Sequence, residues 1–183
     1  KGTGASYVSR RVYKQGTAGG SYASVHDAAS GTVDTGLDVD NSKDNSSRFF
    51  VVRLFLIFDC TLLPVAKITA ASLFFKLGSK REDDAGHSDL HIIKPVHNDP
   101  GVAADYGDVE PEVTPLGTIL YENIVADPAF NEIILSSDAF QYASAGGDGN
   151  FSARCSGDVN DLAPSANNKF NWITFSAFPL SDV

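Results

Sequence analysis

The sequence predicts an all-β protein built as a single-domain β-sandwich, and three observations support this. Its 183 residues include 16 glycines and 8 prolines, which separate short apolar runs rich in Val, Ile, Phe and Thr, the pattern of many short strands joined by turns. No long stretch keeps a helical hydrophobic period. With 43% hydrophobic residues, the chain can bury one full core, so residues 1–183 are expected to form one domain.

Eight strands are expected in order along the chain, each bounded by turn residues. Two long loops interrupt them: residues 15–47, which are small and polar, and residues 97–116, which are acidic and rich in proline. A short helical turn is expected inside the first loop, at "SYASVHDAAS". The expected strands are residues 7–14, 49–58, 68–77, 88–96, 117–121, 131–135, 150–156 and 170–178.

Two of these strands show which faces are buried. The run "FFVVRLFLIF", residues 49–58, is apolar on both alternating faces, so this strand is expected to lie centrally between two layers. In "ITAASLFFKL", residues 68–77, the side chains of Leu73, Phe75 and Leu77 share one face, and that face is expected to be the core side. A central strand covered on both faces predicts a sandwich.

The acidic composition limits the partners. A net charge of −9 and a pI near 4.7, without a basic patch, argue against nucleic acid. No apolar run approaches the roughly 20 residues that span a bilayer, and the first residues lack the apolar segment of a signal peptide, so membrane insertion is not expected. The absence of methionine, even at position 1, indicates a processed or excised chain.

One long stretch resembles a known family. The run "RLFLIFDCTLLPVAKITAASLFFKL" has an Arg, an apolar strand, an Asp and a Pro ahead of an "I-T-x-A-x-L" strand. Upstream "YASVHDAASGTVDTG" and downstream "FNEIILSSDAF" and "GNFSARCSGDVNDLAPSANNKFNWITFSA" continue the likeness in order. Together they resemble the DNRLRE-type domains, related to disaggregatase repeats. The resemblance implies a jelly-roll-like β-sandwich of secreted, cell-surface and viral structural proteins, including polymer-binding modules of polysaccharide lyases, and it implies no catalysis.

Four charged residues lie within the stretches that carry the resemblance: Arg53, Asp59, Arg154 and Asp158. As a binding site, their guanidinium groups would act as forks for a carboxylate-bearing sugar. As architecture, the four would pair with one another and with loop carbonyls at strand ends, because an unpaired buried charge costs several kcal/mol. We favour the architectural interpretation.

An acidic loop is a candidate cation site. In "LDVDNSKDNSS", Asp38, Asp40 and Asp44 could supply oxygen ligands to calcium. The EF-hand pattern fails, because Lys43 stands where that pattern needs glycine. The alternative is that these side chains form the local hydrogen bonds of turns. No cofactor other than this calcium ion is expected.

Aromatic side chains in or near loops are candidates for stacking on sugar rings. They are Tyr106, Tyr121, Tyr142 and Trp172, and the polar surroundings in "ADYGD" favour Tyr106. For each of them the alternative is packing within the core or a loop.

The two cysteines, Cys60 and Cys155, either form one disulfide or remain two buried thiols, and the sequence favours the thiols.

Catalysis is not expected. His26 beside Asp27 resembles a base with its orienting acid, but neighbours on an extended chain point to opposite sides and no nucleophile motif accompanies them. His87, His91 and His97 would suit zinc only on a helix, and they are expected to be surface residues.

The function expected is a structural or adhesive module of an extracellular or virion-surface assembly that contacts other protein subunits, its own copies included. The alternative is a carbohydrate-binding module of a larger secreted polysaccharide-degrading enzyme. If the sandwich lacks its last strand, "NWITFSAF" is expected to form an edge open to a strand from another subunit.

Overall fold

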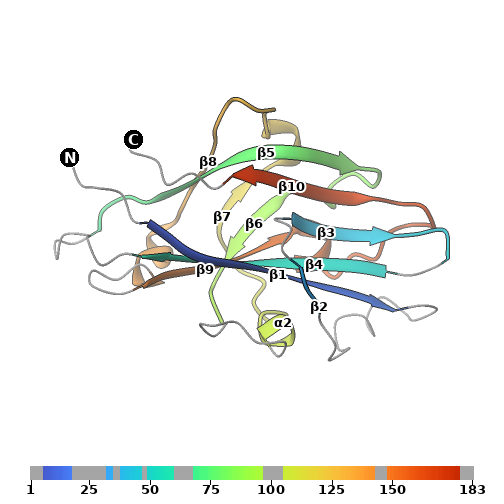
Figure 1. Ribbon diagram of the computed structural model, residues 1–183, viewed down its shortest axis with the longest axis horizontal. Coiled ribbons are helices and arrows are strands. Elements are labelled where there is room, and N and C mark those ends of the chain that lie inside the picture. Colours follow the sequence, from blue (N-terminus) through green and yellow to red (C-terminus); the bar gives the residue numbers. More distant parts are fainter. Residues whose placement is uncertain are drawn as a thin grey trace.

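The computed structural model describes residues 6–17, 32–34, 38–46, 49–59, 68–96, 105–142 and 148–177. Within these parts of the chain, ten strands belong to one sheet and four short helices lie between them (Figure 1). The strands are β1 (Ser6–Thr17), β2 (Thr32–Asp34), β3 (Asp38–Lys43), β4 (Phe49–Asp59), β5 (Ser72–Glu82), β6 (Leu90–Ile93), β7 (Pro115–Ile119), β8 (Asn131–Ile134), β9 (Asp148–Cys155) and β10 (Asn171–Ala177). The helices are α2 (Asp105–Asp108), α3 (Ser156–Val159), η1 (Tyr121–Asn123) and η2 (Ser137–Tyr142).

Strand β4 is the branch point of the sheet. β1 pairs along its whole length on one edge. The other edge is shared, because residues 49–52 pair with β3 and residues 54–59 pair with β9. At Arg53 the sheet therefore divides into two branches, β3–β10–β5–β8 and β9–β6–β7. All pairings between these strands are antiparallel.

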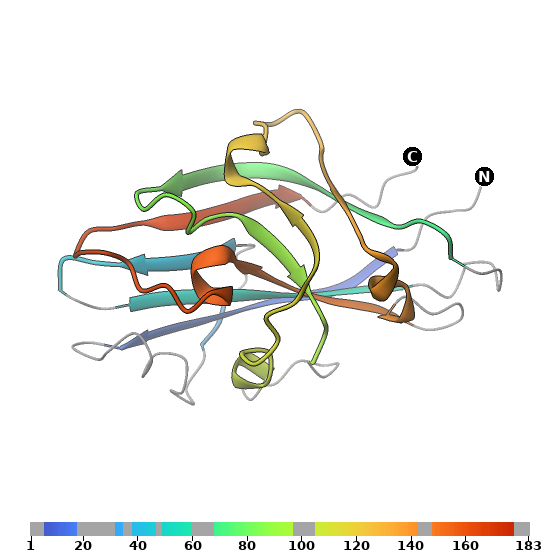
Figure 2. The same cartoon turned by 180° about the vertical axis from the view of Figure 1, so that it is seen from behind.

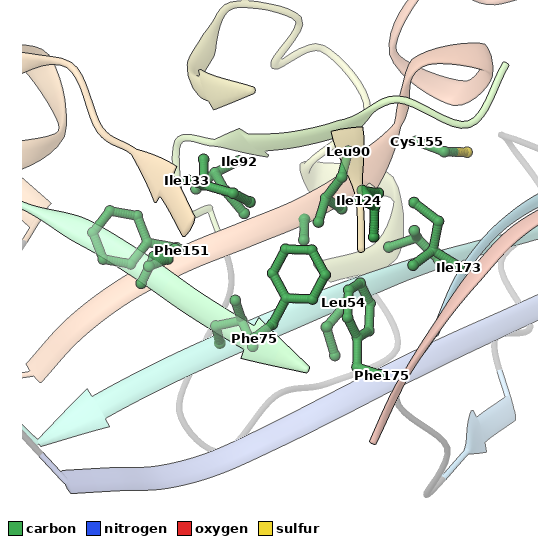
Figure 3. Close-up of a cluster of buried hydrophobic side chains, with 14 of the residues drawn as sticks. Leu54, Phe75, Leu90, Ile92, Ile124, Ile133, Phe151, Cys155, Ile173 and Phe175 are labelled. Atoms are coloured by element: carbon green, nitrogen blue, oxygen red, sulfur yellow. The ribbon is translucent and has the colours of Figure 1, made fainter. Parts of the chain in front are cut away.

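The main core fills the space between the two branches. Leu54 of β4 and Phe151 of β9 meet Phe75 of β5 and Phe175 of β10. The rings of Phe75 and Phe175 pack edge to face, with centroids 5.1 Å apart (Figure 3). Each of these four side chains is at most 6% exposed. Burial of such apolar surface is the main favourable contribution to folding.

The free ends of the two branches meet at β7 and β8. The backbone N–H of Ser136 donates to the carbonyl of Leu116 at 2.7 Å. Gly117 allows the close approach, because a Cβ there would lie 2.8 Å from Ile133 Cγ2 and 2.9 Å from the carbonyl oxygen of Ile134. The side of the molecule that carries β6 and β7 faces the viewer in Figure 2. The predicted all-β class is confirmed, with antiparallel pairing between neighbouring strands, and the sandwich takes the form of a nearly closed barrel.

A smaller core covers the opposite face of β4. Phe49, Val51 and Phe55 pack there with Ile93 and with Val109, which follows α2. β4 is thus buried on both faces, as its sequence predicts. The core side predicted for Leu73, Phe75 and Leu77 is also confirmed.

Several boundaries differ from the sequence prediction. β2 and β3 lie inside the predicted loop 15–47, and α2 lies inside the predicted loop 97–116. The strand expected at 68–77 begins at Ser72 and continues to Glu82. β10 pairs with β3 on one side and β5 on the other, so the expected open edge at "NWITFSAF" is wrong. The helical turn expected at 21–30 lies outside the described residues.

No helix in the described segments is both long enough and apolar enough to cross a bilayer.

Candidate functional site

The buried charges gather where the sheet divides. Arg53 donates from Nε and Nη2 to the two carboxylate oxygens of Asp158, at 2.8 and 2.7 Å. Arg154 donates from Nε to the same carboxylate at 2.5 Å. The three residues are 0%, 1% and 1% exposed, so two guanidinium groups share one carboxylate out of contact with water.

Arg154 also fixes the segment after α2. Its Nη1 lies 3.0 to 3.1 Å from the carbonyl oxygens of Val109, Glu110 and Glu112, and its Nη2 donates to the carbonyl of Asp158 at 2.9 Å. A planar guanidinium with five donors suits this task, because it can serve several acceptors at once. The chain around α2 is therefore tied to β9 through one side chain.

The electrostatics of this cluster hold Asp158 ionised. Burial raises the pKa of the Asp158 carboxyl, but the charges and hydrogen bonds of Arg53 and Arg154 outweigh that effect and keep the pKa well below its usual range. A carboxylate with so low a pKa, bound by two cations, is unsuited to proton transfer near neutral pH.

A pocket of about 300 Å³ opens beside the cluster. Arg154 and Asp158 contribute to its wall, but they are bound to each other in an ion pair. Glu110 and Asp161 add negative charge to the lining. A carboxylate-bearing sugar would be repelled here, so the geometry favours the architectural interpretation of the charges. The lining residues are Glu110, Pro111, Val113, Arg154, Asp158, Val159 and Asp161.

Asp59 ends β4, and its side chain lies outside the described part of the structure. Its backbone pairs with Ser6 and Asp148 at the end of β4, six residues along the strand from Arg53. At about 3.3 Å per residue the backbone positions of Asp59 and Arg53 are about 20 Å apart. The partners of the Asp59 side chain stay a prediction.

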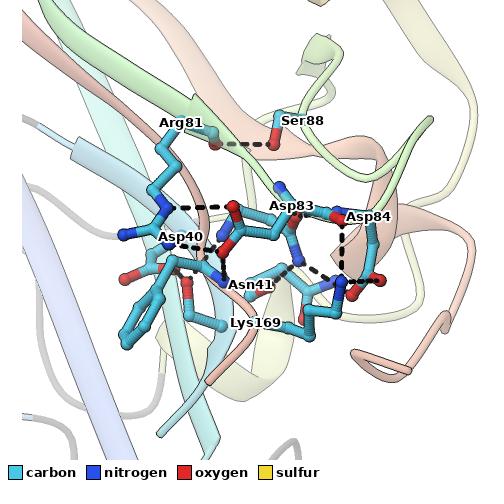
Figure 4. Close-up of polar contacts among 10 residues, drawn as sticks. Asp40, Asn41, Arg81, Asp83, Asp84, Ser88 and Lys169 are labelled. Carbon is cyan, nitrogen blue, oxygen red and sulfur yellow. Dashed lines mark hydrogen bonds and ion pairs between the residues drawn. The ribbon is translucent and has the colours of Figure 1, made fainter. Parts of the chain in front are cut away.

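A second polar network joins β3 and β10 to the turn after β5 (Figure 4). The Asn171 side chain accepts from the backbone N–H groups of Asp83 and Asp84 at 3.0 and 2.9 Å, and it donates to the carbonyl of Asn41 at 3.0 Å. Asp84 accepts in turn from the backbone N–H and the hydroxyl of Ser165, at 3.1 and 2.5 Å. These bonds pair the buried side chain of Asn171 with three main-chain groups at this end of the barrel.

His87 lies inside this network and is only 9% exposed, so its expected place at the surface is wrong. Its Nδ1 is 3.4 Å from Asn41 Nδ2, and its carbonyl accepts from the N–H of Gly157 at 3.0 Å. His91 is half-buried, with Nδ1 2.8 Å from the hydroxyl of Thr118. His26, Asp27 and His97 lie outside the described residues.

The candidate calcium ligands do not converge. Asp40 accepts a hydrogen bond from the hydroxyl of Ser42, and Asp44 accepts one from the backbone N–H of Ser46 at 2.8 Å. Asp38 lies on β3 opposite Thr174. Across the described segments, no three His, Cys, Asp or Glu side chains form a group that could hold a metal ion.

The aromatic candidates are dispersed. Tyr142 is half-buried against the main core, and the ring of Tyr121 lies under the ammonium of Lys80, 4.1 Å from it. Trp172 is half-buried on β10. Tyr106 belongs to α2, but its side chain lies outside the described part of the structure.

Cys155 is a free, fully buried thiol in the main core. Cys60 lies outside the described residues.

Sequence reasoning missed the polar side chains that surround Trp172. Asp40 lies directly opposite it on β3 and Arg81 directly opposite it on β5. The only signal for Arg81 is the charged run "KREDD", which is typical of a solvated turn. Its position beside an aromatic residue depends on strand pairing across 91 residues of chain (172 − 81).

Comparison with protein-family models, with curated proteins and with solved structures found no match for this chain. The resemblance to DNRLRE-type domains stays a prediction.

Proposed function

We propose that this chain is a non-catalytic structural or adhesive module of an extracellular or virion-surface assembly, and that it acts through protein–protein contacts. An apolar patch on the outer face of β5 and β8 carries the proposal. Ile134 and Phe130 are 74% and 48% exposed, and the half-buried Phe74 lies between them on the neighbouring strand. We call these three residues the β8 patch.

The chemistry of the patch suits a protein partner. Alternation along β8 points Ile134 outward while its neighbour Ile133 fills the core at 1% exposure. Exposed apolar residues that gather on one face, with charged groups around them, mark interaction sites. Those charged groups are Glu132 and the ion pair of Lys76 with Asp127, whose N–O distance is 3.4 Å.

Mass photometry and electron microscopy of the purified protein test the proposal. The wild-type chain is expected to form oligomers, filaments or lattices, and Ile134→Lys is expected to reduce them because it places a charge in the patch. Leu162→Lys is the matched control, since Leu162 is 43% exposed but lies after α3, outside the patch. A monomer at every concentration, or equal loss with both variants, would rule the proposal out.

A second candidate is a carbohydrate-binding module of a larger secreted enzyme. The surface around Trp172 favours it, because that surface offers an aromatic side chain with polar groups on both sides. Both candidates place the chain outside the cell.

A further inference from the structure

Trp172 occupies the centre of the outer face of one branch of the sheet. Its neighbours on β10, Asn171 and Ile173, are both fully buried on the core side, so Trp172 points outward. Asp40 of β3 and Arg81 of β5 are its direct cross-strand partners, and residues paired in this way project from the same face. An aromatic side chain therefore lies between a carboxylate and a guanidinium.

The guanidinium beside Trp172 is held in place. Arg81 donates from Nε to Asp83 at 3.0 Å, and its Nη2 lies 2.9 Å from the other carboxylate oxygen (Figure 4). Its guanidinium also stacks on the ring of Phe170, 4.7 Å from the centroid. Asp83 is fixed in turn by the backbone N–H of Phe170 at 3.0 Å. Although half of the Arg81 side chain is exposed, its orientation is determined by these contacts.

The carboxylate on the other side is also oriented. Asp40 accepts from the hydroxyl of Ser42, and that hydroxyl oxygen accepts from the backbone N–H of Asn171 at 2.9 Å. Further along the strands, the hydroxyl oxygens of Ser79 and Thr174 lie 2.8 Å apart. Hydrogen-bond acceptors and donors thus surround one aromatic residue. Because these side chains are already oriented, binding a ligand would cost them little conformational entropy.

The local charge selects the class of ligand. Asp40 and Asp83 are negative and Arg81 is positive, so these three groups sum to −1, within a chain of net charge −9. A polyanionic ligand would be repelled, whereas an uncharged ligand rich in hydroxyl groups would find both hydrogen-bond donors and acceptors.

We propose that this face binds a neutral oligosaccharide, with a sugar ring stacked on the indole of Trp172 and its hydroxyl groups hydrogen-bonded to Asp40 and Arg81. The proposal rests on the carbohydrate-binding candidate above and names its ligand class and its residues. It is independent of the β8 patch.

The intrinsic fluorescence of the protein reports on this site directly, because Trp172 is the only tryptophan in the chain. Hexasaccharides of glucose, mannose and xylose are titrated into the wild-type protein, with an alginate hexasaccharide as the polyanionic comparator. We expect a saturable change in emission with at least one neutral sugar and none with alginate. No change with any neutral sugar at millimolar concentration, or a response to alginate alone, would overturn the proposal.

Calorimetry with variants locates the site. Trp172→Ala is expected to weaken binding about tenfold or more, because it removes the aromatic face on which the sugar ring stacks. Phe130→Ala is the matched control, because it removes an exposed aromatic side chain from the β8 patch and is expected to leave sugar binding unchanged. If Trp172→Ala fails to fold, sugar binding is measured with Trp172→Phe and Arg81→Gln instead. Both variants are expected to bind the sugar more weakly than the wild type while their melting temperature is unchanged.

Wild-type affinity in all of these folded variants would place the sugar elsewhere and overturn the assignment. The assembly proposal fails separately, through the response to Ile134→Lys, so the two outcomes are distinguishable.

Discussion

At the scale of single residues, Arg53 shows why this fold holds a charge in its core. β4 pairs with β3 up to Val52 and with β9 from Leu54, so Arg53 stands where the ladder changes partner. Its bidentate bonds to Asp158 attach α3 at that point. An apolar side chain could fill the space but could not bind the carboxylate that also holds Arg154.

Asp158→Asn should be strongly destabilising. The change removes the negative charge to which both buried guanidinium groups, those of Arg53 and Arg154, are bound. Breaking a buried ion pair costs about 3–5 kcal/mol. Urea unfolding followed by circular dichroism measures the free energy of unfolding. Asp138→Asn, at an exposed carboxylate in η2, is the matched control and should change stability little. Equal stability of the two variants would mean that the cluster contributes no net stability.

The same carboxylate should make stability depend on pH. The Asp158 pKa is held well below its usual range in the folded protein, whereas an unfolded aspartate has a pKa of about 3.9. The folded state therefore binds fewer protons, and the stabilisation is present above about pH 4 and is lost as the pH falls toward the folded pKa. The free energy of unfolding, measured in urea from neutral to acidic pH, should fall more steeply for the wild type than for Asp158→Asn. Parallel curves would contradict the assignment.

At the scale of elements, the short helix α3 is buried and packs between β9 and β3. It follows β9 directly, and Gly157 faces Asn41 of β3. The Asn41 amide donates to the carbonyl of Leu162 at 2.9 Å, and the N–H of Leu162 donates to the carbonyl of Gly157 at 2.8 Å. The turn after α3 is thereby tied back to the branch point.

Gly157→Ala should prevent α3 from occupying this position. A Cβ at Gly157 would lie 1.8 Å from Asn41 Nδ2 and 3.0 Å from His87 Nδ1, and both side chains are buried. Overpacking of this kind typically costs about 1–3 kcal/mol and sometimes more. Gly107→Ala in α2 is the control, because a Cβ there has no atom within 4 Å, and it should be neutral or slightly stabilising. The melting temperatures of the two variants, measured by thermal unfolding, test this prediction. Similar values would show that the position of Gly157 tolerates a methyl group.

The elements that the sequence predicted well are those whose apolar pattern is local. β4 follows from a run that is apolar on both faces, and the core face of β5 follows from alternation. β3, "DVDNSK", was missed because its Asn41 and Ser42 bind polar partners at the end of the barrel, so the strand carries only one apolar residue. The second half of β5, residues 78–82, was missed because pairing with β10, rather than its own polar sequence, makes it a strand.

The candidate site was predicted in part for a similar reason. The structure brings Arg53, Arg154 and Asp158 together. Asp59 stands six residues along the same strand from Arg53, a separation that the rise per residue of a strand already implies. The carbonyl groups that Arg154 binds belong to a loop 45 to 42 residues away, and no side-chain pattern marks backbone acceptors.

At the scale of the whole molecule, the two proposed surfaces lie at opposite ends of one face. Phe74 of the β8 patch stands near the start of β5 and Arg81 near its end, seven residues or about 23 Å apart. A subunit bound through the β8 patch would therefore leave the Trp172 face uncovered. The two proposals are compatible in one assembly that also adheres to a polymer.

The cooperativity of the whole barrel should be readable at Cys155. Burial raises the pKa of its thiol and leaves it 0% exposed, between the branches of the sheet, where it pairs with Leu90. Because the thiolate is the reactive form, labelling requires the core to open. In a Cys60→Ser background, the rate of labelling at Cys155 should rise with urea in proportion to the globally unfolded fraction. A cysteine placed at exposed Glu122 in the double variant Cys60→Ser, Cys155→Ala should label rapidly at all urea concentrations. Labelling of Cys155 that is fast and independent of urea would show that the two branches of the sheet separate without global unfolding. The contact between β7 and β8 would then be weaker than its hydrogen bond and packing indicate.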